Sequence, residues 1–539
     1  MTQATRRHFL KQASALSSMG MVAPLALNLG AITRAAAQSA GSGYKALVCI
    51  YLNGGNDAFN TVLATDSTSW THYTTQRGAR GGSNSIALMP LGTAAVSGAA
   101  GSSPERLGGV LPITHSGRAA HADRQFALHP ALTQVRSLYQ NGRVAVLANV
   151  GTLTRPTLKA DWSDNRKSKP AKLFSHNDQQ STWLSFRPEG AGEGWGGLMG
   201  DQLMSTNGQG RTDADAQLIR RSFTCMTPTA SNVWLSGRHV LAYQSGDMHV
   251  QRLGSDDQIY GNARLHAAVA AIMGKADANG QTKVAARNAY AADHQKIAQR
   301  ALQASAMLSR QLAPLGVAPW STANVTDPYS DPLLKYISPV NGALTFNPLA
   351  LQLQMVARLI DTNRAASLGI TRQFFSVNLG GFDTHNNQIA DHAERMAQLD
   401  HALGYFDSVL GGMPGGNLRS QVTTFTASEF GRTFTNNGDG TDHGWGGHHL
   451  IMGGAVNGAE VFGTFPRYST ANASGNFGSQ DQIQNGVLIP TTSVDHYAYT
   501  LGRWMGVPAN VLVKADGSGI LPNLSQFDSS GHDLGFMRA

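Results

Sequence analysis

The stretch YKALVCIYLNGGND, residues 44–57, decides the fold class. Its apolar run at 44–52 is typical of a buried strand. A turn loosened by Gly54 and Gly55 then brings Asp57 to the end of that strand. In an open α/β sheet, ligands bind outside the carboxyl ends of the strands. The stretch therefore predicts an α/β protein with a polar site at one edge of its sheet.

Three further apolar runs, at 144–150, 374–379 and 422–427, also precede residues that can bind metal or act in catalysis. Those residues are Ser175, His176 and Asp178 after a loop, then Asp383 and His385, then Glu429 and Arg432 with Asp442, His443, His448 and His449 close behind. Side chains far apart in the chain would then meet at one edge. The pattern indicates a metal site or active site assembled from four strand ends.

The pattern as a whole predicts a mostly parallel central sheet with helices on both faces. A helix opened by Pro130 connects the runs at 44–52 and 144–150, so these two strands should be parallel. Further helices are expected at 347–360, 387–410 and 494–505.

We expect one domain over residues 38–539, with insertions at about 65–120 and 205–340. The first insertion is rich in Gly, Ser, Thr and Ala and is expected to be irregular. In the second, residues 205–255 favour an antiparallel insertion. Residues 259–312 favour two or more helices that form a lid or cap.

The N-terminal segment predicts an export signal. Arg6 and Arg7 precede Phe-Leu-Lys at 9–11, a mildly apolar stretch follows at 13–32, and three alanines stand at 35–37. This is the order of a signal peptide, and the paired arginines make it a twin-arginine signal. We therefore expect the twin-arginine machinery to export the chain to the periplasm or beyond. Residues 1–37 would be removed, leaving no stable membrane span.

Charge and cysteine content exclude two classes of function. The segment to residue 37 carries four basic residues and no acid, half of the formal net charge of +8, and no basic run with interleaved aromatics appears. We therefore expect no nucleic-acid partner. Two cysteines, Cys49 and Cys225, exclude a cysteine-rich metal site. Cys49 should be a buried hydrophobic residue, with a disulfide to Cys225 as the alternative.

The acids and histidines suit a divalent cation. Asp383 and His385 stand two residues apart after a Gly-Gly turn, so both can face one ion. Histidine nitrogen and carboxylate oxygen suit zinc, and more oxygen ligands would suit manganese or magnesium. Asp57 has a competing interpretation as a turn aspartate that accepts backbone N–H bonds.

The densest stretch, residues 428–449, carries acids and histidines among glycines, which let the backbone approach an ion or anion closely. Arg432 can hold a phosphate or sulfate with its forked guanidinium. Ser175, at a helix start, is either a nucleophile activated beside a metal or an N-cap residue. Its neighbour His176 and Arg432 complete the candidate catalytic residues. The candidate metal ligands are Asp57, Asp383, His385, Glu429, Asp442 and His443.

Six motifs spread over the chain match those of a known family. They are NGGNDAFNT (53–61), LHP (128–130), SHNDQ (175–179), GGFDTH (380–385), SEFGRT (428–433) and TDHG (441–444). With them the chain resembles the bacterial DUF1501 family. That family looks like a branch of the alkaline phosphatase and sulfatase superfamily, and its members often carry twin-arginine signals.

The resemblance implies an alkaline phosphatase-like fold, two divalent metal ions (zinc, manganese or magnesium) and a nucleophile at a helix start. It implies Asp57 and Glu429 at one metal, Asp383, His385 and His443 at the other, and Ser175 as the nucleophile. Asp442-His443 is an alternative for the acid–histidine pair that many relatives carry where this chain has Glu429-Phe430. Neither cysteine lies in the Cys-x-Pro-x-Arg pattern of formylglycine sulfatases.

Two functions from different classes follow. The first is an exported metal-dependent hydrolase of phosphate or sulfate esters, acting on a small-molecule or polymer substrate. The alternative is a non-catalytic alkaline phosphatase-like fold that serves binding or assembly at the cell surface.

Overall fold

The central strand of the main sheet is β1 (Lys45–Leu52), which the opening stretch predicts. The computed structural model describes residues 43–79, 84–164, 169–250, 252–253, 258–273 and 288–538. The sheet order is β13-β5-β12-β11-β1-β10-β6-β7, with β14 also paired to β5. Only the β11–β12 and β12–β5 pairs are antiparallel. The expected mostly parallel α/β sheet is therefore confirmed.

The strands have the following bounds. The main sheet contains β5 (Val144–Gly151), β6 (Cys225–Thr227), β7 (Tyr243–Gln244), β10 (Arg372–Leu379), β11 (Val422–Ala427), β12 (Gly447–Met452), β13 (Val461–Phe462) and β14 (Thr492–Ser493). A small sheet contains β2 (Val62–Ala64), β3 (Leu111–Ile113) and β4 (Phe126–Leu128), and a hairpin joins β8 (Lys335–Ile337) to β9 (Leu344–Phe346).

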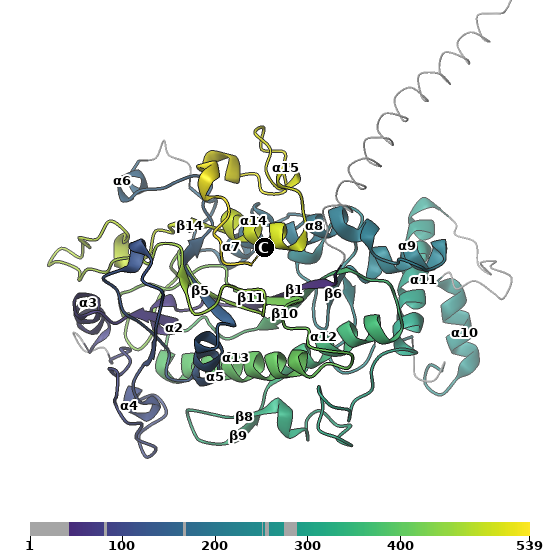
Figure 1. The fold of residues 1–539 in the computed structure, drawn as a ribbon, viewed down its shortest axis with the longest axis horizontal. Coiled ribbons are helices and arrows are strands. Elements are labelled where there is room, and N and C mark those ends of the chain that lie inside the picture. The colour runs from purple at the N-terminus through teal and green to yellow at the C-terminus, as the bar shows by residue number, and fades with distance from the viewer. Residues whose placement is uncertain are drawn as a thin grey trace, which may run out of the picture.

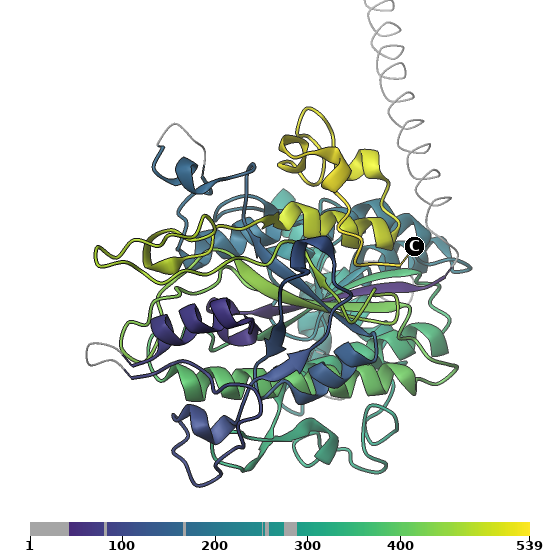
Figure 2. The same cartoon turned by 60° about the vertical axis from the view of Figure 1, so that its left-hand side comes forward.

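Two hydrophobic cores lie on the two faces of the sheet, because successive strand side chains point to opposite faces. Val48 and Ile50 belong to one core, whereas Leu47, Cys49 and Tyr51 belong to the other. The first core is covered by α5 (Thr133–Gln140), α12 (Pro348–Ala365) and α13 (Gln388–Gly411), and the second by α7 (His176–Ser185), α8 (Trp195–Leu203) and α14 (Val494–Met505). Figures 1 and 2 show the helices on both faces.

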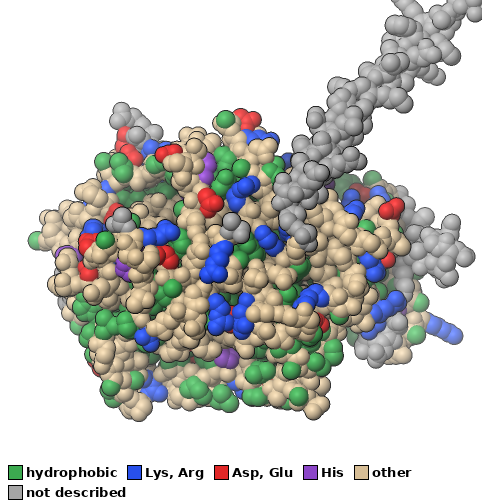
Figure 3. Space-filling model, in the orientation of Figure 1, with side chains coloured by type: hydrophobic (Ala, Val, Ile, Leu, Met, Phe, Trp, Pro, Cys, Tyr) green, Lys and Arg blue, Asp and Glu red, His purple; other side chains and the backbone are tan. Residues whose placement is uncertain are grey.

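Further α-helices surround these six, and some of them, such as α3 and α11, add buried side chains to the first core. They are α2 (Ala58–Thr61), α3 (Ser67–Arg77), α4 (Pro104–Leu107), α6 (Lys159–Trp162), α9 (Asp213–Ser222), α10 (Ala263–Ile272), α11 (Ala289–Ser309) and α15 (Ala509–Leu512). The face drawn in Figure 3 intersperses basic, acidic and hydrophobic side chains. No helix among the described residues is both long and apolar enough to span a bilayer.

β1 and β5 run in the same direction, as the crossover rule predicts, but they are not neighbours. β11 and β12 lie between them. Since β12 is antiparallel to both β11 and β5, and β11 is parallel to β1, β5 is parallel to β1. The carboxyl ends of β1, β5, β10 and β11 therefore share one edge.

Two expectations about the insertions are wrong. Residues 65–120 were expected to be irregular, yet they contain α3, which Asp66 caps by accepting a hydrogen bond from the Ser69 N–H. Its sequence STSWTHYTTQR is poor in strong helix formers, so the helix depends on its cap and on tertiary contacts. Within 205–255, α9 leads into β6, and β6 and β7 join the main sheet as parallel strands instead of an antiparallel insertion.

Three other expectations concern the helices of the second insertion, the two cysteines and the N-terminal signal. The helices expected within 259–312 are α10 and α11. Cys49 and Cys225 are both buried and free, so they form no disulfide. The predicted signal at 1–37 lies outside the described residues.

Candidate metal centre

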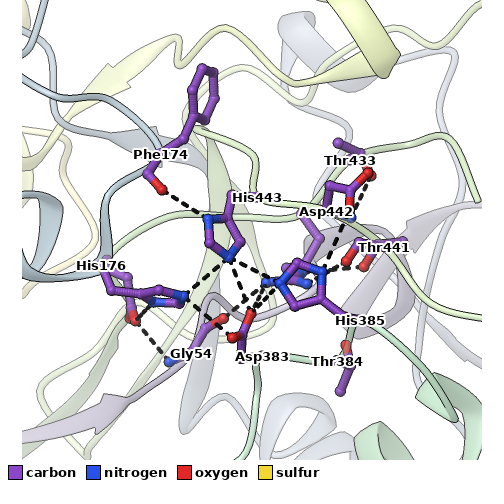
Figure 4. Close-up of polar contacts among 12 residues, drawn as sticks. Gly54, Phe174, His176, Asp383, Thr384, His385, Thr433, Thr441, Asp442 and His443 are labelled. Carbon is purple, nitrogen blue, oxygen red and sulfur yellow. Dashed lines mark hydrogen bonds and ion pairs between the residues drawn. The ribbon is translucent and has the colours of Figure 1, made fainter. Parts of the chain in front are cut away.

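Several chain segments meet at the shared edge of β1, β10 and β11. Because β12 is antiparallel to β11, the residues that precede β12 lie at the edge where β11 ends. The side chains brought there are Asp383 and His385 after β10, Glu429 and Arg432 after β11, His443 before β12, and His176 at the start of α7. Figure 4 shows this group in close-up.

Three of these side chains converge on one point. Nε2 of His176 lies 3.1 Å from Nε2 of His443 and 3.4 Å from Oδ2 of Asp383. Nε2 of His443 lies 3.2 Å from Oδ1 of Asp383. The candidate ligand atoms of His176, Asp383 and His443 all lie within 4.8 Å of one another. We call these three residues the metal cluster.

His385 borders the metal cluster on the side away from His176 in Figure 4. Its Nε2 lies 3.2 Å from Nε2 of His443 and 3.0 Å from Oδ1 of Asp383. His385 is therefore a further donor next to the three.

Acceptors behind the rings turn His176 and His443 toward the cluster. Nδ1 of His176 lies 2.9 Å from Oε1 of Glu429, and Nδ1 of His443 lies 2.8 Å from the carbonyl oxygen of Phe174. An acceptor at Nδ1 keeps the ring proton there, so Nε2 presents a lone pair. Histidine ligands of metals are oriented in this way in most proteins.

His385 has an acidic neighbour at ion-pair distance, since its Nδ1 lies 3.4 Å from Oδ1 of Asp442. With Nδ1 protonated in His176 and His443, the Nε2 lone pairs of these two rings face each other and the carboxylate of Asp383. Lone pairs this close repel unless a cation lies among them.

The distances fit one ion. For zinc with ligands at about 2.0–2.1 Å in a tetrahedron, neighbouring ligand atoms are about 3.3 Å apart. In the metal cluster the two Nε2 atoms are 3.1 Å apart, and His443 and His176 lie 3.2 and 3.4 Å from different oxygens of Asp383. With one oxygen of Asp383 taken alone, the three ligand atoms lie within 4.8 Å of one another. Two imidazoles and a carboxylate are also a common zinc ligand set.

Phe430 and Gly54 hold the cluster in shape. The Phe430 ring stacks on His443 with centroids 4.7 Å apart and also packs on His176 at 4.9 Å. Gly54 has φ +119°, and a Cβ there would lie 2.3 Å from the backbone nitrogen of Asp383. Only glycine therefore allows the β1 loop to approach so closely.

Glu429 and Arg432 both bind the backbone of that loop. The Gly54 N–H donates to Oε1 of Glu429 at 2.8 Å. Nη1 of Arg432 donates to the Gly54 carbonyl at 3.2 Å and to Oδ1 of Asp383 at 2.6 Å. Glu429, predicted as a metal ligand, thus lies behind His176, and its Oε1 accepts from both His176 and Gly54.

Arg432 does not face the solvent as a substrate-binding group would. Its side chain is 0% exposed. Its other donors bind the hydroxyl and the carbonyl oxygen of Thr441. The residue expected to hold a phosphate or sulfate therefore supports Asp383 and two loops.

Hydrogen bonds, neighbouring charges and burial shift the pKa values of His176, His443 and Asp383. The hydrogen bond to Glu429 raises the pKa of His176 above its ordinary value, whereas burial lowers the pKa of His443. Burial raises the pKa of Asp383, but its hydrogen bond and charge interaction with Arg432 outweigh this, so the net pKa is lowered. Asp383 is thereby held as a carboxylate, the form that binds a cation.

Asp57 lies apart from the metal cluster. Both its oxygens bind Arg77, at 2.5 and 2.9 Å, and both residues are 0% exposed. Its Oδ1 also accepts from the Phe59 N–H, which caps α2. This is the turn-aspartate interpretation, reinforced by a buried ion pair, and it leaves neither oxygen open to a metal.

Ser175 precedes α7 but makes no side-chain cap bond to that helix. Its hydroxyl donates to Oδ2 of Asp178 at 3.0 Å. The chain neighbours of Ser175 both touch the cluster, since the Phe174 carbonyl binds His443 and His176 is a member. His448 and His449, from the dense stretch, are buried in β12.

Several supporting groups escaped sequence reasoning. The Phe174 carbonyl and the Phe430 ring bring no chemistry of their own, and Arg77 lies in a helix that the sequence did not reveal. His176 was expected to act in catalysis, yet it lies among the candidate ligands. The one usable signal was its place beside Ser175 in SHNDQ, a motif already singled out.

Comparison with known proteins adds the family and nothing further. No curated protein and no solved structure matches the chain. The model of the family described as "Protein of unknown function (DUF1501)" matches residues 44–515, which include every residue of the metal cluster and its supports. The chain therefore belongs to the DUF1501 family.

Proposed function

We propose that His176, Asp383 and His443 bind a divalent cation, with His385 as an adjacent donor. The observation that carries the proposal is the convergence of Nε2 atoms and a carboxylate within hydrogen-bond distance, with an acceptor fixed behind each ring. Zinc suits this nitrogen-rich set best, and manganese or magnesium would need more oxygen ligands.

The proposal names one ion. Among the described residues, one group of three candidate ligands lies within mutual reach of a single cation. Two ions remain the expectation from the resemblance to the alkaline phosphatase and sulfatase superfamily. A second equivalent of tightly bound metal on elemental analysis would support it.

We further propose that the chain is an exported metal-dependent hydrolase of phosphate or sulfate esters. When bound, a divalent cation supplies Lewis acidity toward an ester oxygen and acidifies a water. The side chains of Asp383 and His385 are 43% and 46% exposed, so an ester can reach them from the solvent. Asp442, whose side chain is 53% exposed, lies 3.4 Å from Nδ1 of His385.

Ser175 is the proposed nucleophile. Its hydroxyl donates to Asp178, which would take the proton as the serine oxygen bonds to phosphorus or sulfur. The ester bond would break in the same step, its oxygen would leave with the electron pair and take a proton from water, and a second water would then hydrolyse the serine ester. Ser175→Ala should then abolish turnover while metal content and melting temperature stay near those of the parent. Turnover equal to the parent's would reject the serine and favour a water nucleophile.

Export is part of the proposal and has its own test. We expect the Arg6→Lys/Arg7→Lys variant to stay inside the cell, because twin-arginine recognition needs the arginine pair. Cell fractionation and immunoblotting measure the location. Undiminished export of the double variant would reject this signal.

One observation favours the non-catalytic alternative. Arg432 is buried and bound to Asp383, Gly54 and Thr441, so it does not present its guanidinium to a transferred anion. In that case the metal cluster would serve binding or assembly at the cell surface.

Metal analysis combined with an ester screen separates the two functions. The parent should hold at least one equivalent of divalent metal and hydrolyse one of 4-nitrophenyl phosphate, bis(4-nitrophenyl) phosphate or 4-nitrophenyl sulfate. His443→Ala should lose both properties. His239→Ala is the control and should lose neither. His239 is exposed, and it is its backbone N–H that donates to Asp201. Bound metal without turnover of any ester would favour the alternative, and a metal-free parent would overturn the proposed site.

A further inference from the structure

We infer that a buried hydrogen-bond chain running from α3 to Asp383 positions this carboxylate for the cation, with Gln388 and Thr441 as its positioning residues. This role rests on the proposed metal site. This series of hydrogen bonds links six residues, in the order Arg77, Asp57, Gln388, Thr441, Arg432 and Asp383.

The inner half of this chain begins with a closed ion pair. Arg77 binds both oxygens of Asp57. Nε2 of Gln388, at the start of α13, also donates to Oδ2 of Asp57 at 2.5 Å. A carboxylate can only accept hydrogen bonds, so the NH₂ group of Gln388 must face Asp57.

The outer half follows from this orientation. Oε1 of Gln388 must face Thr441, whose hydroxyl therefore donates to it at 2.6 Å. The oxygen of that hydroxyl then accepts from Nε of Arg432 at 3.2 Å, and Nη1 of Arg432 donates to Asp383 at 2.6 Å. The charge of Asp57 thus fixes the donors and acceptors from Gln388 to Thr441, and Arg432 donates both to Thr441 and to Asp383.

The side chains that form this hydrogen-bond chain are held in place because they are buried. Arg77, Asp57, Gln388, Thr441 and Arg432 are each 0% exposed. Solvent water therefore has no direct access to replace a lost bond, and hydrogen bonds are stronger in a low-dielectric interior. The guanidinium of Arg432 is held at Oδ1 of Asp383, so Oδ2 stays turned toward His176.

Gln388 also ties together two loops that carry histidines of the site. Its Oε1 accepts from the hydroxyl of Thr384 at 3.3 Å as well as from Thr441. The Thr441 N–H donates to the Thr384 carbonyl at 3.1 Å. Thr384 directly precedes His385, and Thr441 stands two residues before His443, so one buried amide sets the spacing of the two loops.

The test compares variants that differ by one hydroxyl. Thr441→Val keeps the shape of the side chain but removes the donor to Gln388, and Thr441→Ser keeps that donor. Thr362→Val removes a buried hydroxyl on α12 that donates to the Arg358 carbonyl, and it serves as the matched control. Zinc affinity is measured by competition with a chromophoric chelator, and the melting temperature of the metal-free protein is measured alongside.

We expect Thr441→Val to bind zinc about 10–100-fold more weakly than the parent, the range found when residues that support metal ligands are removed. Thr441→Ser and Thr362→Val should bind zinc within about threefold of the parent. Gln388→Met, which breaks the chain at its centre, should reproduce the loss caused by Thr441→Val. The second variant guards against a fold defect at either position.

The outcomes separate this role from the proposed function. A parent that binds no zinc would overturn both. A parent that binds zinc, with unchanged affinity in folded Thr441→Val and Gln388→Met, would overturn the positioning role alone. Equal weakening in Thr362→Val would also overturn it, because the loss would then follow from any buried hydroxyl.

Discussion

Asp57 and Asp383 stand in the same local sequence, Gly-Gly-x-Asp, after the neighbouring parallel strands β1 and β10, yet they meet opposite surroundings. Asp57 is 0% exposed and bound through both oxygens to Arg77. Asp383 is 43% exposed and has one bond to Arg432, with three imidazoles around it. A forked guanidinium closes one carboxylate, whereas the histidines leave the other open to a cation.

The difference teaches that a strand-end aspartate cannot be assigned a role from its own segment. Arg77 comes from α3, a helix in the stretch after β1. Its ion pair occupies both carboxylate oxygens of Asp57. Of the histidines around Asp383, His385 comes from the same loop, whereas His176 and His443 come from two other segments. We therefore assign Asp57 to the fold and propose Asp383 as a ligand of the cation.

The largest expected effect breaks the Asp57 side of the comparison. Asp57→Asn leaves the buried Arg77 charge without its partner and should lower the free energy of unfolding by about 3–5 kcal/mol. Urea denaturation measures it. The double variant Asp57→Asn/Arg77→Met should recover part of the loss, because both charges are then absent. A single variant as stable as the parent would contradict the assignment of Asp57 to the fold.

Asp383→Asn tests the other side. It should weaken divalent metal binding by more than about a hundredfold, the upper limit for residues that only support a ligand. Its stability should fall less than that of Asp57→Asn, because Arg432 keeps the carbonyl oxygens of Gly54 and Thr441 as partners. Equilibrium dialysis measures the binding. Unchanged metal affinity would remove Asp383 from the ligand set.

Glu429→Gln and Asp442→Asn compare how much the acidic neighbours of His176 and His385 contribute to metal affinity. Glu429 is buried and lies 2.9 Å from His176, whereas the Asp442–His385 distance is 3.4 Å. We expect Glu429→Gln to lower metal affinity about 10–100-fold and Asp442→Asn to have a smaller effect. Isothermal titration calorimetry with zinc measures both. The reverse ranking would show that His385 contributes more than His176.

A further expected effect concerns two buried histidines of β12, His448 and His449. Burial lowers the pKa of His448 and of His449 to about 3. Since the ordinary pKa is 6.5, the unfolded chain takes up protons below that pH while the folded chain does not, so stability falls as pH drops from 6.5 toward 3. Each histidine contributes a slope of up to about 1.4 kcal/mol per pH unit.

Urea denaturation at pH 7 and pH 5 measures this slope, and His448→Gln should reduce it by one proton. A slope unchanged by His448→Gln would mean that His448 is protonated in the folded protein.

The fold was predictable where one segment carries its own signal. The runs of β1, β10 and β11 are short and contain β-branched and aromatic residues, which favours strands, and their predicted ends agree with the structure to within two residues. α3 was not predictable, because its serines and threonines favour no helix and its cap at Asp66 resembles any polar turn. The parallel strands β6 and β7 were missed because strands of two or three residues carry too little periodicity.

In the candidate site, too, some residues were predictable from the sequence and others were not. Asp383, His385 and His443 were singled out because their residue types bind metal. The supports were not, because the role of a glutamine such as Gln388 depends on which side chains the fold brings to it. Glu429 and Arg432 were found as residues but given roles in direct contact with metal or substrate, which their burial does not suit.

The metal cluster should bind a divalent cation. X-ray data collected above and below the zinc absorption edge, from crystals grown with zinc, test it most directly. We expect an anomalous peak that appears only above the edge, about 2.0–2.1 Å from Nε2 of His176 and of His443 and bound to Asp383. A fully ordered cluster without such a peak, or zinc bound only elsewhere in the molecule, would contradict the account.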